Sequence, residues 1–276
     1  MPGKDRRLIS REDAGHVERR TLLCFTLNYY WMDTGAFRKS RQYISLLRSH
    51  DELPDNEYFL KIPYKTFLID LSKSKDAIYA AFDYTGARYK INKAFKNGVV
   101  VRRAETAAEK QQFHDFYQAF AEDPSRKNKI LVLQKSELDS LEIFYAVSAK
   151  GEYLGGIGLL PSPDRRYVLY KYAATVHRFC ENELMLWHAI QYAKDARYAW
   201  FDMSWMWSTD DKTSDQYRLY QFKKKFGGDL VPFYTYVKLR GPFIIPGMLF
   251  KLILQVFFKG DIIKVTLLLK RMRVFK

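Results

Sequence analysis

The chain has 276 residues, of which 16% are aromatic and 28% charged, and its formal net charge at pH 7 is +15. This length allows one large domain or two small ones, and the high aromatic content excludes a charged, disordered chain. The positive field predicts anionic partners, with phosphorylated metabolites, RNA and acidic lipid all fitting it.

Metal and disulfide chemistry have little support in the sequence. Cys24 and Cys180 are too few for a disulfide framework or a structural zinc site. The five histidines show no HExxH motif or paired spacing, so we expect no metal site. Because no apolar run follows the basic residues of the first twenty, we also expect no secretory signal and a cytoplasmic location.

The first 98 residues contain two predicted strands and a predicted helix. Residues 21–32 and 63–71 are rich in β-forming side chains, and the basic stretch between them has no clear pattern. Residues 72–98 are predicted to be helical, with Asn97-Gly98 as the stop. Helical spacing places Arg88 on the apolar face of this helix, together with Tyr84, Ile91 and Phe95. Arg88 there either clamps a phosphate through two hydrogen bonds or extends its charged end into solvent.

From residue 99 to 239 the predicted order is strand, helix, three strands, helix, strand, helix, strand. The helices cover 106–123, 181–196 and 216–226, and a short strand covers 199–205. Strands flanked by helices, with a late helix between two strands, predict an α/β fold in which helices cover a mixed central sheet.

Three consecutive lysines lie in the last predicted helix. Leu219, Phe222 and Phe226 form its apolar stripe, and Lys223 lies at the edge of that stripe. Lys224 and Lys225 point away from it, as a solvated basic face or as phosphate contacts. From its position alone, Lys223 either lies near a partly desolvated site or covers Phe222 with its aliphatic stem.

Two strands carry further candidate residues. Asp202 lies in a short apolar strand, where an unpaired carboxylate is costly, so it is a general base, a partner that orients Lys223, or a structural hydrogen-bond acceptor. Tyr170 and Tyr172 alternate onto one face of their strand, with Lys171 on the other. They are either substrate contacts or packing residues.

The last 36 residues differ from the rest of the chain. Residues 243–258 contain one charged side chain, Lys251, and are too short to span a bilayer comfortably. A second amphipathic segment follows and ends in KRMRVFK. This pattern predicts an in-plane membrane anchor on acidic lipid, with docking to a partner or to the first half of the protein as the alternative.

Three segments carry a resemblance to a known family: YKINKAFKNGVVV (89–101), LMLWHAIQYAKDARYAWFDMS (184–204) and above all YQFKKKFGGDLVPF (220–233). Together they resemble the FemABX-like branch of the GNAT acyltransferase superfamily, over about residues 64–240. The resemblance implies a GNAT-type sheet and transfer of an acyl or aminoacyl group onto an amine. It also implies that Lys223, which matches the lysine of the family's FK-x-x-FG motif, lies at the reacting centre, where its charge would stabilise the oxyanion formed when an amine attacks an ester or thioester.

Two features depart from that family. Its members usually carry two full GNAT-like domains, whereas the first 98 residues here allow only a reduced one. The turn that cradles coenzyme A phosphates in many GNAT enzymes reads ATVHRFCENELM (174–185), without glycine and with acidic residues that oppose phosphate binding. This argues against coenzyme A as the carrier of the donor group and leaves an aminoacyl-tRNA or an acyl-carrier protein as the expected donor.

The sequence therefore predicts a reduced GNAT-like region (1–98), a GNAT acyltransferase domain (99–240) and a basic amphipathic helical tail (241–276). The expected function is transfer from an aminoacyl-tRNA or acyl thioester to an amine of a cell-envelope precursor, at the inner face of the membrane and without a tightly bound cofactor. Lys223 and Asp202 are the predicted catalytic residues, and the predicted substrate contacts are Arg88, Tyr170, Tyr172, Phe222 and Lys224. The alternative is a catalytically inactive protein whose basic face binds tRNA or acidic lipid.

Overall fold

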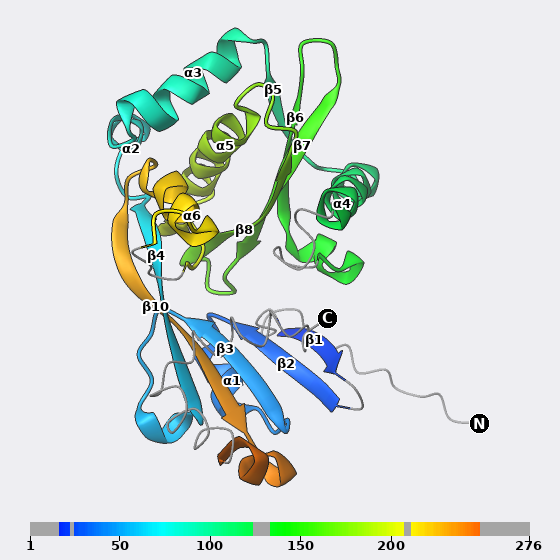
Figure 1. Ribbon diagram of the computed structural model, residues 1–276, viewed down its shortest axis with the longest axis vertical. Coiled ribbons are helices and arrows are strands. Elements are labelled where there is room, and N and C mark those ends of the chain that lie inside the picture. Colours follow the sequence, from blue (N-terminus) through cyan, green and yellow to red (C-terminus); the bar gives the residue numbers. More distant parts are fainter. Residues whose placement is uncertain (1–16, 23–24, 124–132, 207–210, 249–276) are drawn as a thin grey trace, which may run out of the picture.

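The structure is a computed structural model that describes residues 17–22, 25–123, 133–206 and 211–248. One ten-stranded sheet runs through it in the order β1-β2-β3-β10-β4-β9-β8-β7-β6-β5 (Figure 1). Neighbouring strands are antiparallel except for the pairs β2–β3 and β8–β9. The strands are β1 (Val17–Leu22), β2 (Phe25–Trp31), β3 (Ile44–Ser49), β4 (Leu60–Asp70), β5 (Val100–Arg103), β6 (Glu142–Val147), β7 (Tyr153–Pro161), β8 (Tyr167–Thr175), β9 (Trp200–Asp202) and β10 (Asp229–Leu239).

Helices cover both faces of the part of the sheet that runs from β4 through β9, β8, β7 and β6 to β5. On one face α2, α3 and α5 pack over a large apolar cluster that also takes in the end of α6. On the other face α4 and the 3-10 turn η3 cover a second cluster. The described helices are α1 (Thr34–Lys39), α2 (Lys75–Ala80), α3 (Tyr89–Lys96), α4 (Ala107–Glu122), α5 (Glu181–Asp195) and α6 (Asp215–Lys224), with the π-helical turn η2 (Tyr84–Arg88) and the 3-10 turns η1 (Asp55–Glu57), η3 (Lys135–Ser140) and η4 (Gly241–Phe243).

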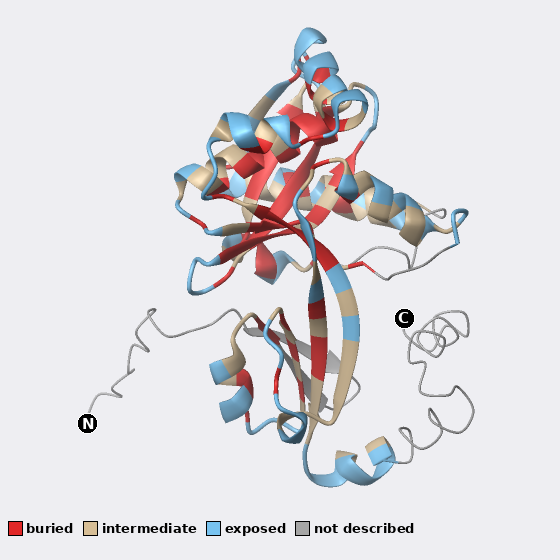
Figure 2. Cartoon of the chain, turned by 90° about the vertical axis from the view of Figure 1, so that its left-hand side faces the viewer, coloured by how far each residue is buried: buried red, intermediate tan, exposed pale blue. Residues whose placement is uncertain are grey.

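The N-terminal strands form a smaller unit at one end of the sheet. The long strands β4 and β10 leave the helix-covered part and continue into this unit, where β10 pairs with β3 (Figures 1 and 2). Helix α1 packs there over a small cluster that includes Tyr30, Phe37 and Leu47. The predicted α/β architecture, a mixed sheet flanked by helices, is confirmed.

The core does not divide at residue 98. Phe67 of β4, Ile78 of α2 and Ile91 of α3 belong to the same apolar cluster as Leu186 and Phe201. A boundary between 1–98 and 99–240 thus cuts through one continuous core. Residues 60–98 complete the helix-covered part, and the smaller unit is formed by β1, β2, β3 and α1 with the far ends of β4 and β10.

Only the first residues of the predicted tail are described. They form η4 and a short helical stretch on which Ile245 and Met248 are exposed. Residues 249–276, which carry most of the predicted anchor, lie outside the described residues. Among the described helices, none has the length and apolar character needed to cross a bilayer.

Candidate active site

Strands β8 and β9 separate at one end of the helix-covered half. They run parallel but pair only between residues 167–169 and 200–202. Beyond that point β8 continues to Thr175, whereas the chain after Asp202 turns toward β4 and forms a bridge between Met206 and Lys65. Backbone groups following Asp202 are therefore available to side chains that approach from α6.

Lys223 is buried beside this turn. Helix α6 begins at the capping residue Ser214, whose side chain accepts a hydrogen bond from the backbone of Tyr217, and Lys223 lies in its last turn. The residue is 2% exposed, and its Nζ donates to the carbonyls of Ser204 (2.8 Å) and Trp205 (3.3 Å). Burial lowers the pKa of Lys223 to about 7, against a weaker opposing effect of Asp202. This amine can therefore change its charge near neutral pH.

The other two lysines of the triplet differ from Lys223 and from each other. Lys224 is exposed, as its position on the helix predicts. Lys225 was expected to point into solvent, and that expectation is wrong. Its side chain is 13% exposed, and its Nζ donates to Glu183 Oε1 at the start of α5 (2.5 Å). The carboxylate on a neighbouring helix explains the difference, because it compensates the buried charge.

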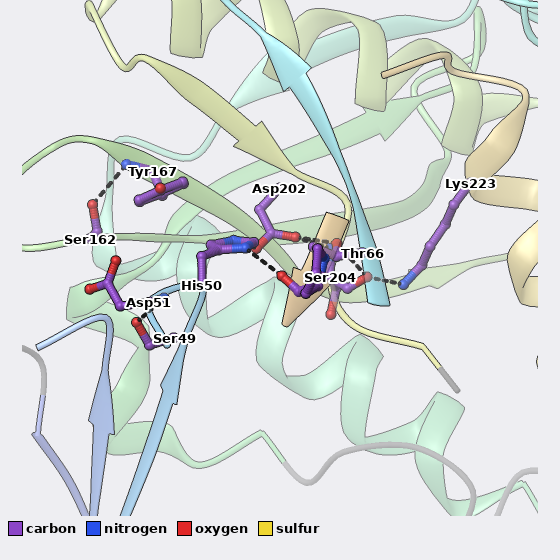
Figure 3. A network of polar contacts seen from close by, with 10 residues as sticks. Ser49, His50, Asp51, Thr66, Ser162, Tyr167, Asp202, Ser204 and Lys223 are labelled. Atoms are coloured by element: carbon purple, nitrogen blue, oxygen red, sulfur yellow. Dashed lines mark hydrogen bonds and ion pairs between the residues drawn. The ribbon is translucent and has the colours of Figure 1, made fainter. Parts of the chain in front are cut away.

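Asp202 accepts hydrogen bonds from three different parts of the chain. Its Oδ1 accepts from the Thr66 hydroxyl (2.5 Å) and from the backbone N–H of Ser204 (2.7 Å), and its Oδ2 lies 3.0 Å from His50 Nε2 (Figure 3). Ser204 has a left-handed backbone (φ 71°), a conformation that is uncommon outside glycine. Through it Asp202 and Lys223 are linked, because the N–H of Ser204 binds the carboxylate and its carbonyl binds the amine.

His50 is the residue of this network that sequence reasoning missed. It directly follows β3, and its ring stacks on Tyr167 (4.9 Å between centroids) and meets Phe233 edge-on (5.0 Å). Its Nδ1 lies 3.2 Å from the carbonyl oxygen of Pro232. His50 lies in the stretch between residues 32 and 63 that showed no clear pattern, 152 positions from Asp202, so no local signal pointed to the pair.

Arg88 lies elsewhere, on a helix face that the sequence predicted wrongly. The buried residues of this segment are Ala87, Ile91 and Ala94, whereas Tyr84 and Phe95, expected inside, are each 74% exposed. The π-helical turn η2 adds a residue to the turn and so rotates the preceding residues by about 100° relative to α3.

The side chain of Arg88 borders an open hollow instead of the network. The hollow has a volume of about 430 Å³ and is also lined by Tyr84, Tyr89, Asn92 and Lys96. The Arg88 guanidinium lies 5.0 Å from the Tyr84 ring, and its buried Nε has no hydrogen-bond partner among the described residues. No hydrogen bond in the described part of the chain joins Arg88 to Lys223, Asp202 or His50.

Tyr170 and Tyr172 lie on opposite faces of the sheet, contrary to the prediction. In the pairing of β7 with β8, Tyr170 faces Leu159 and Tyr172 faces Gly158, so Lys171 is an extra residue, a β-bulge. The bulge turns Tyr172 to the α4 side, where its hydroxyl donates to Glu137 Oε1 (2.9 Å).

Tyr170 remains on the α5 side of the sheet. Its hydroxyl donates to Asn182 Oδ1 (3.2 Å), and burial raises its pKa. Phe222 is half-buried on α6, with its ring edge-on to Phe226 (5.6 Å) and 4.3 Å from Lys225 Nζ. Tyr170, Tyr172 and Phe222 therefore all pack against other parts of the protein.

The start of α5 is occupied by the protein's own carboxylates. Glu181 is fully buried and its Oε2 accepts from the backbone of Phe179 (2.8 Å). Glu183 lies within 2.5 Å of Lys225 Nζ and 3.2 Å of Lys90 Nζ. Burial alone would raise the pKa of Glu183, but the two lysines and their hydrogen bonding hold it below its usual value. An added phosphate would have to compete with these carboxylates.

Metal ligands do not converge in the described residues. There, no group of three or more His, Cys, Asp or Glu side chains is arranged to hold an ion. Of the predicted site residues, the structure joins Lys223 and Asp202, adds His50, and leaves the predicted substrate contacts outside this network.

Comparison with solved structures gives the fold a precedent. No protein-family model and no curated protein sequence matches the chain. FemX superposes with a TM-score of 0.58 at 16% identity, over 82% of this chain and 86% of its own. L-PGS from Bacillus licheniformis gives 0.54 at 12% identity, over 86% and 84%. A C-terminal domain assigned to a lysylphosphatidylglycerol synthetase of Agrobacterium fabrum gives 0.51 at 12% identity, over 87% and 89%. The predicted resemblance to the FemABX-like GNAT branch is thus confirmed at the level of the fold.

Proposed function

We propose that this protein transfers an acyl or aminoacyl group from an activated donor to an amine of a cell-envelope precursor. The observation that carries the proposal is the buried Lys223 amine beside the point where β8 and β9 separate. The shared fold with FemX and the lysylphosphatidylglycerol synthetases supports it. Since the latter name denotes attachment of lysine to a membrane lipid, it favours an aminoacyl donor and an envelope acceptor.

In this proposal the acceptor nitrogen attacks the donor carbonyl carbon. The carbonyl oxygen gains the negative charge, the donor's ester oxygen or thioester sulfur then leaves, and the proton lost by the amine ends on that leaving group or in solvent. The ammonium form of Lys223 stabilises the oxyanion, an interaction that is stronger in a desolvated site than in water. Asp202 holds the turn that positions Lys223, because all its recorded contacts are with protein donors.

The donor is better explained as an aminoacyl-tRNA or a carrier-protein thioester than as coenzyme A. Glu181 and Glu183 occupy the start of α5, where a helix would otherwise attract a phosphate. The hollow beside Arg88 combines guanidinium and ammonium groups with exposed aromatic rings, a set of groups that suits phosphates and bases. The turn η2, which lines part of the hollow, meets the end of α6, since the backbone N–H of its capping residue Asp83 donates to the Lys225 carbonyl (2.8 Å). We assign the phosphate-bearing part of the donor to this hollow, with exposed Lys224 as a further contact.

A transfer assay tests the function directly. Purified protein is offered labelled aminoacyl-tRNA, acyl-carrier thioester or acyl-coenzyme A, each with an amine-bearing membrane lipid or a lipid-linked cell-wall precursor that carries an amine. We expect product with at least one of the first two donors and none from the Lys223→Met variant. Binding of tRNA or acidic lipid without product from any donor would identify a binding protein instead.

We also place the protein at the inner surface of the membrane. Ile244, Ile245 and Met248 expose apolar side chains where the tail begins, and the residues beyond are apolar and basic in sequence. Deletion of residues 241–276 should abolish co-sedimentation with vesicles containing acidic phosphatidylglycerol. Unchanged sedimentation would exclude the tail as the anchor.

A further inference from the structure

His50 joins the smaller N-terminal unit to the candidate active site. It follows β3, yet its side chain, which is 9% exposed, lies between elements of the helix-covered half. Tyr167 of β8 stacks on one side of the ring, Phe233 of β10 meets it edge-on, and Asp202 of β9 lies at Nε2. Enclosure from three strands fixes the orientation of the imidazole.

Both ring nitrogens of His50 face oxygen atoms that accept hydrogen bonds. Nδ1 lies 3.2 Å from the Pro232 carbonyl, and Nε2 lies 3.0 Å from the Asp202 carboxylate. A neutral imidazole carries one N–H, so it can satisfy only one of these acceptors. The imidazolium form donates to both, and the geometry therefore selects it.

Among the described residues, the charged partner in direct contact with Asp202 is then His50. The remaining recorded donors to its carboxylate are neutral: the Thr66 hydroxyl and the Ser204 N–H. Lys223 Nζ is hydrogen-bonded instead to the carbonyl oxygens of Ser204 and Trp205. The Asp202 carboxylate therefore interacts electrostatically with both His50 and Lys223, but its direct ion pair is with His50.

We propose that His50 is a positioning residue: as an imidazolium it neutralises Asp202 and fixes the Ser204–Trp205 turn, so that Lys223 remains uncommitted to a carboxylate. The charge of Lys223 is then available for an oxyanion on a substrate. This inference rests on the proposed role of Lys223, but it is tested without substrate, so a failed transfer assay does not decide it.

Three further charged groups act on Tyr167, the ring on which His50 stacks. Asp51 follows His50 in the chain, and Asp164 and Arg166 lie in the turn between β7 and β8. In the part of the chain that the structure describes, the salt-bridge partner of His50 is Asp202.

The first measurement uses the unaltered protein. Long-range proton–nitrogen NMR correlation distinguishes imidazolium from neutral imidazole for each histidine. We expect the His50 ring to carry protons on both nitrogens in the folded protein at pH 7.5, because both nitrogens face acceptors. A His50 ring with one unprotonated nitrogen at that pH would overturn the proposal.

The second measurement follows the titration of the Lys223 amine by nitrogen NMR, with its signal assigned by its loss in Lys223→Arg. In His50→Gln the amide still donates to Asp202 but the charge is gone, so Asp202 should favour protonated Lys223. We expect the titration midpoint to rise by about one pH unit or more. An unchanged midpoint in a folded variant would contradict the proposal. Should His50→Gln fail to fold, the measurement on the unaltered protein decides.

A matched control removes a histidine–aspartate contact elsewhere. His114 on α4 lies 3.4 Å from Asp115 Oδ1, in a near-surface pair of the same chemical kind. His114→Gln should leave the midpoint of Lys223 where it is. An equal shift in both variants would show that the effect is not specific to His50.

Discussion

Two lysines in different regions of the described chain, Lys171 and Lys223, have buried side chains but different surroundings. Beneath α4, Lys171 has an 8% exposed side chain whose Nζ lies 2.6 Å from Glu137, a carboxylate that also accepts from the Tyr172 hydroxyl. Beside the end of β9, Lys223 is equally buried but is hydrogen-bonded to backbone carbonyls. A buried cation with its own carboxylate is a structural element, whereas one without a direct ionic partner retains charge to offer a ligand.

The largest expected effect concerns activity at Lys223. Lys223→Met should lower kcat/KM for transfer by at least about 100-fold, because the oxyanion loses its cation. Lys223→Arg keeps a charge and should retain part of the rate. Because the cation is the active form, kcat/KM of the unaltered protein should also lose this contribution as pH rises through about 7, a decline that Lys223→Arg should not show. Full turnover in Lys223→Met would refute the assigned role.

The next effect concerns the paired lysine. Lys171→Met leaves the buried carboxylate of Glu137 without its cation, and we expect the free energy of unfolding to fall by about 3 kcal/mol. Urea denaturation measures this, with Lys150→Met, at an exposed turn lysine, as the control expected to change stability by less than about 0.5 kcal/mol. Equal stability of the two variants would mean that the ion pair contributes nothing.

The smallest effect has the opposite sign. Lys223→Met removes a buried charge and should raise the free energy of unfolding at pH 7 by about 1–2 kcal/mol, because relief of desolvation exceeds the loss of two hydrogen bonds. The folded pKa of about 7 lies below the unfolded value of 10.5, so the unfolded chain binds more protons between them. This lysine's contribution to stability therefore rises from pH 7 to 10.5. The difference between unaltered protein and Lys223→Met should shrink over that range, and a constant difference would be inconsistent with a lowered pKa.

Local patterns in the sequence predicted some of the site well. The order of elements from residue 99 to 239 is observed, and the helical position of Lys223 at the edge of an apolar stripe agrees with its burial. Both depend on the regular periods of helices and strands, which a short segment determines by itself.

Local irregularities of the backbone made the predictions for Tyr170, Tyr172 and Arg88 wrong. One bulged residue in β8 separates Tyr170 from Tyr172, and one π-helical turn changes which side of its segment Arg88 occupies. Such insertions change the phase of every residue beyond them while leaving the composition unchanged. Lys225 was misplaced for another reason, since its partner Glu183 is on a different helix.

The sequence by itself determined the class of fold, the helix that carries the lysine triplet, and the excess of positive charge. Only the tertiary structure decided which of the three lysines is hydrogen-bonded to backbone carbonyls, and that Asp202 of β9 meets a histidine that follows β3, three strands away in the sheet. The periodicity of a helix or strand depends on residues that are close in the sequence. A hydrogen bond between residues 152 positions apart depends instead on how the strands are ordered in the sheet, and that order is fixed only when the whole chain packs.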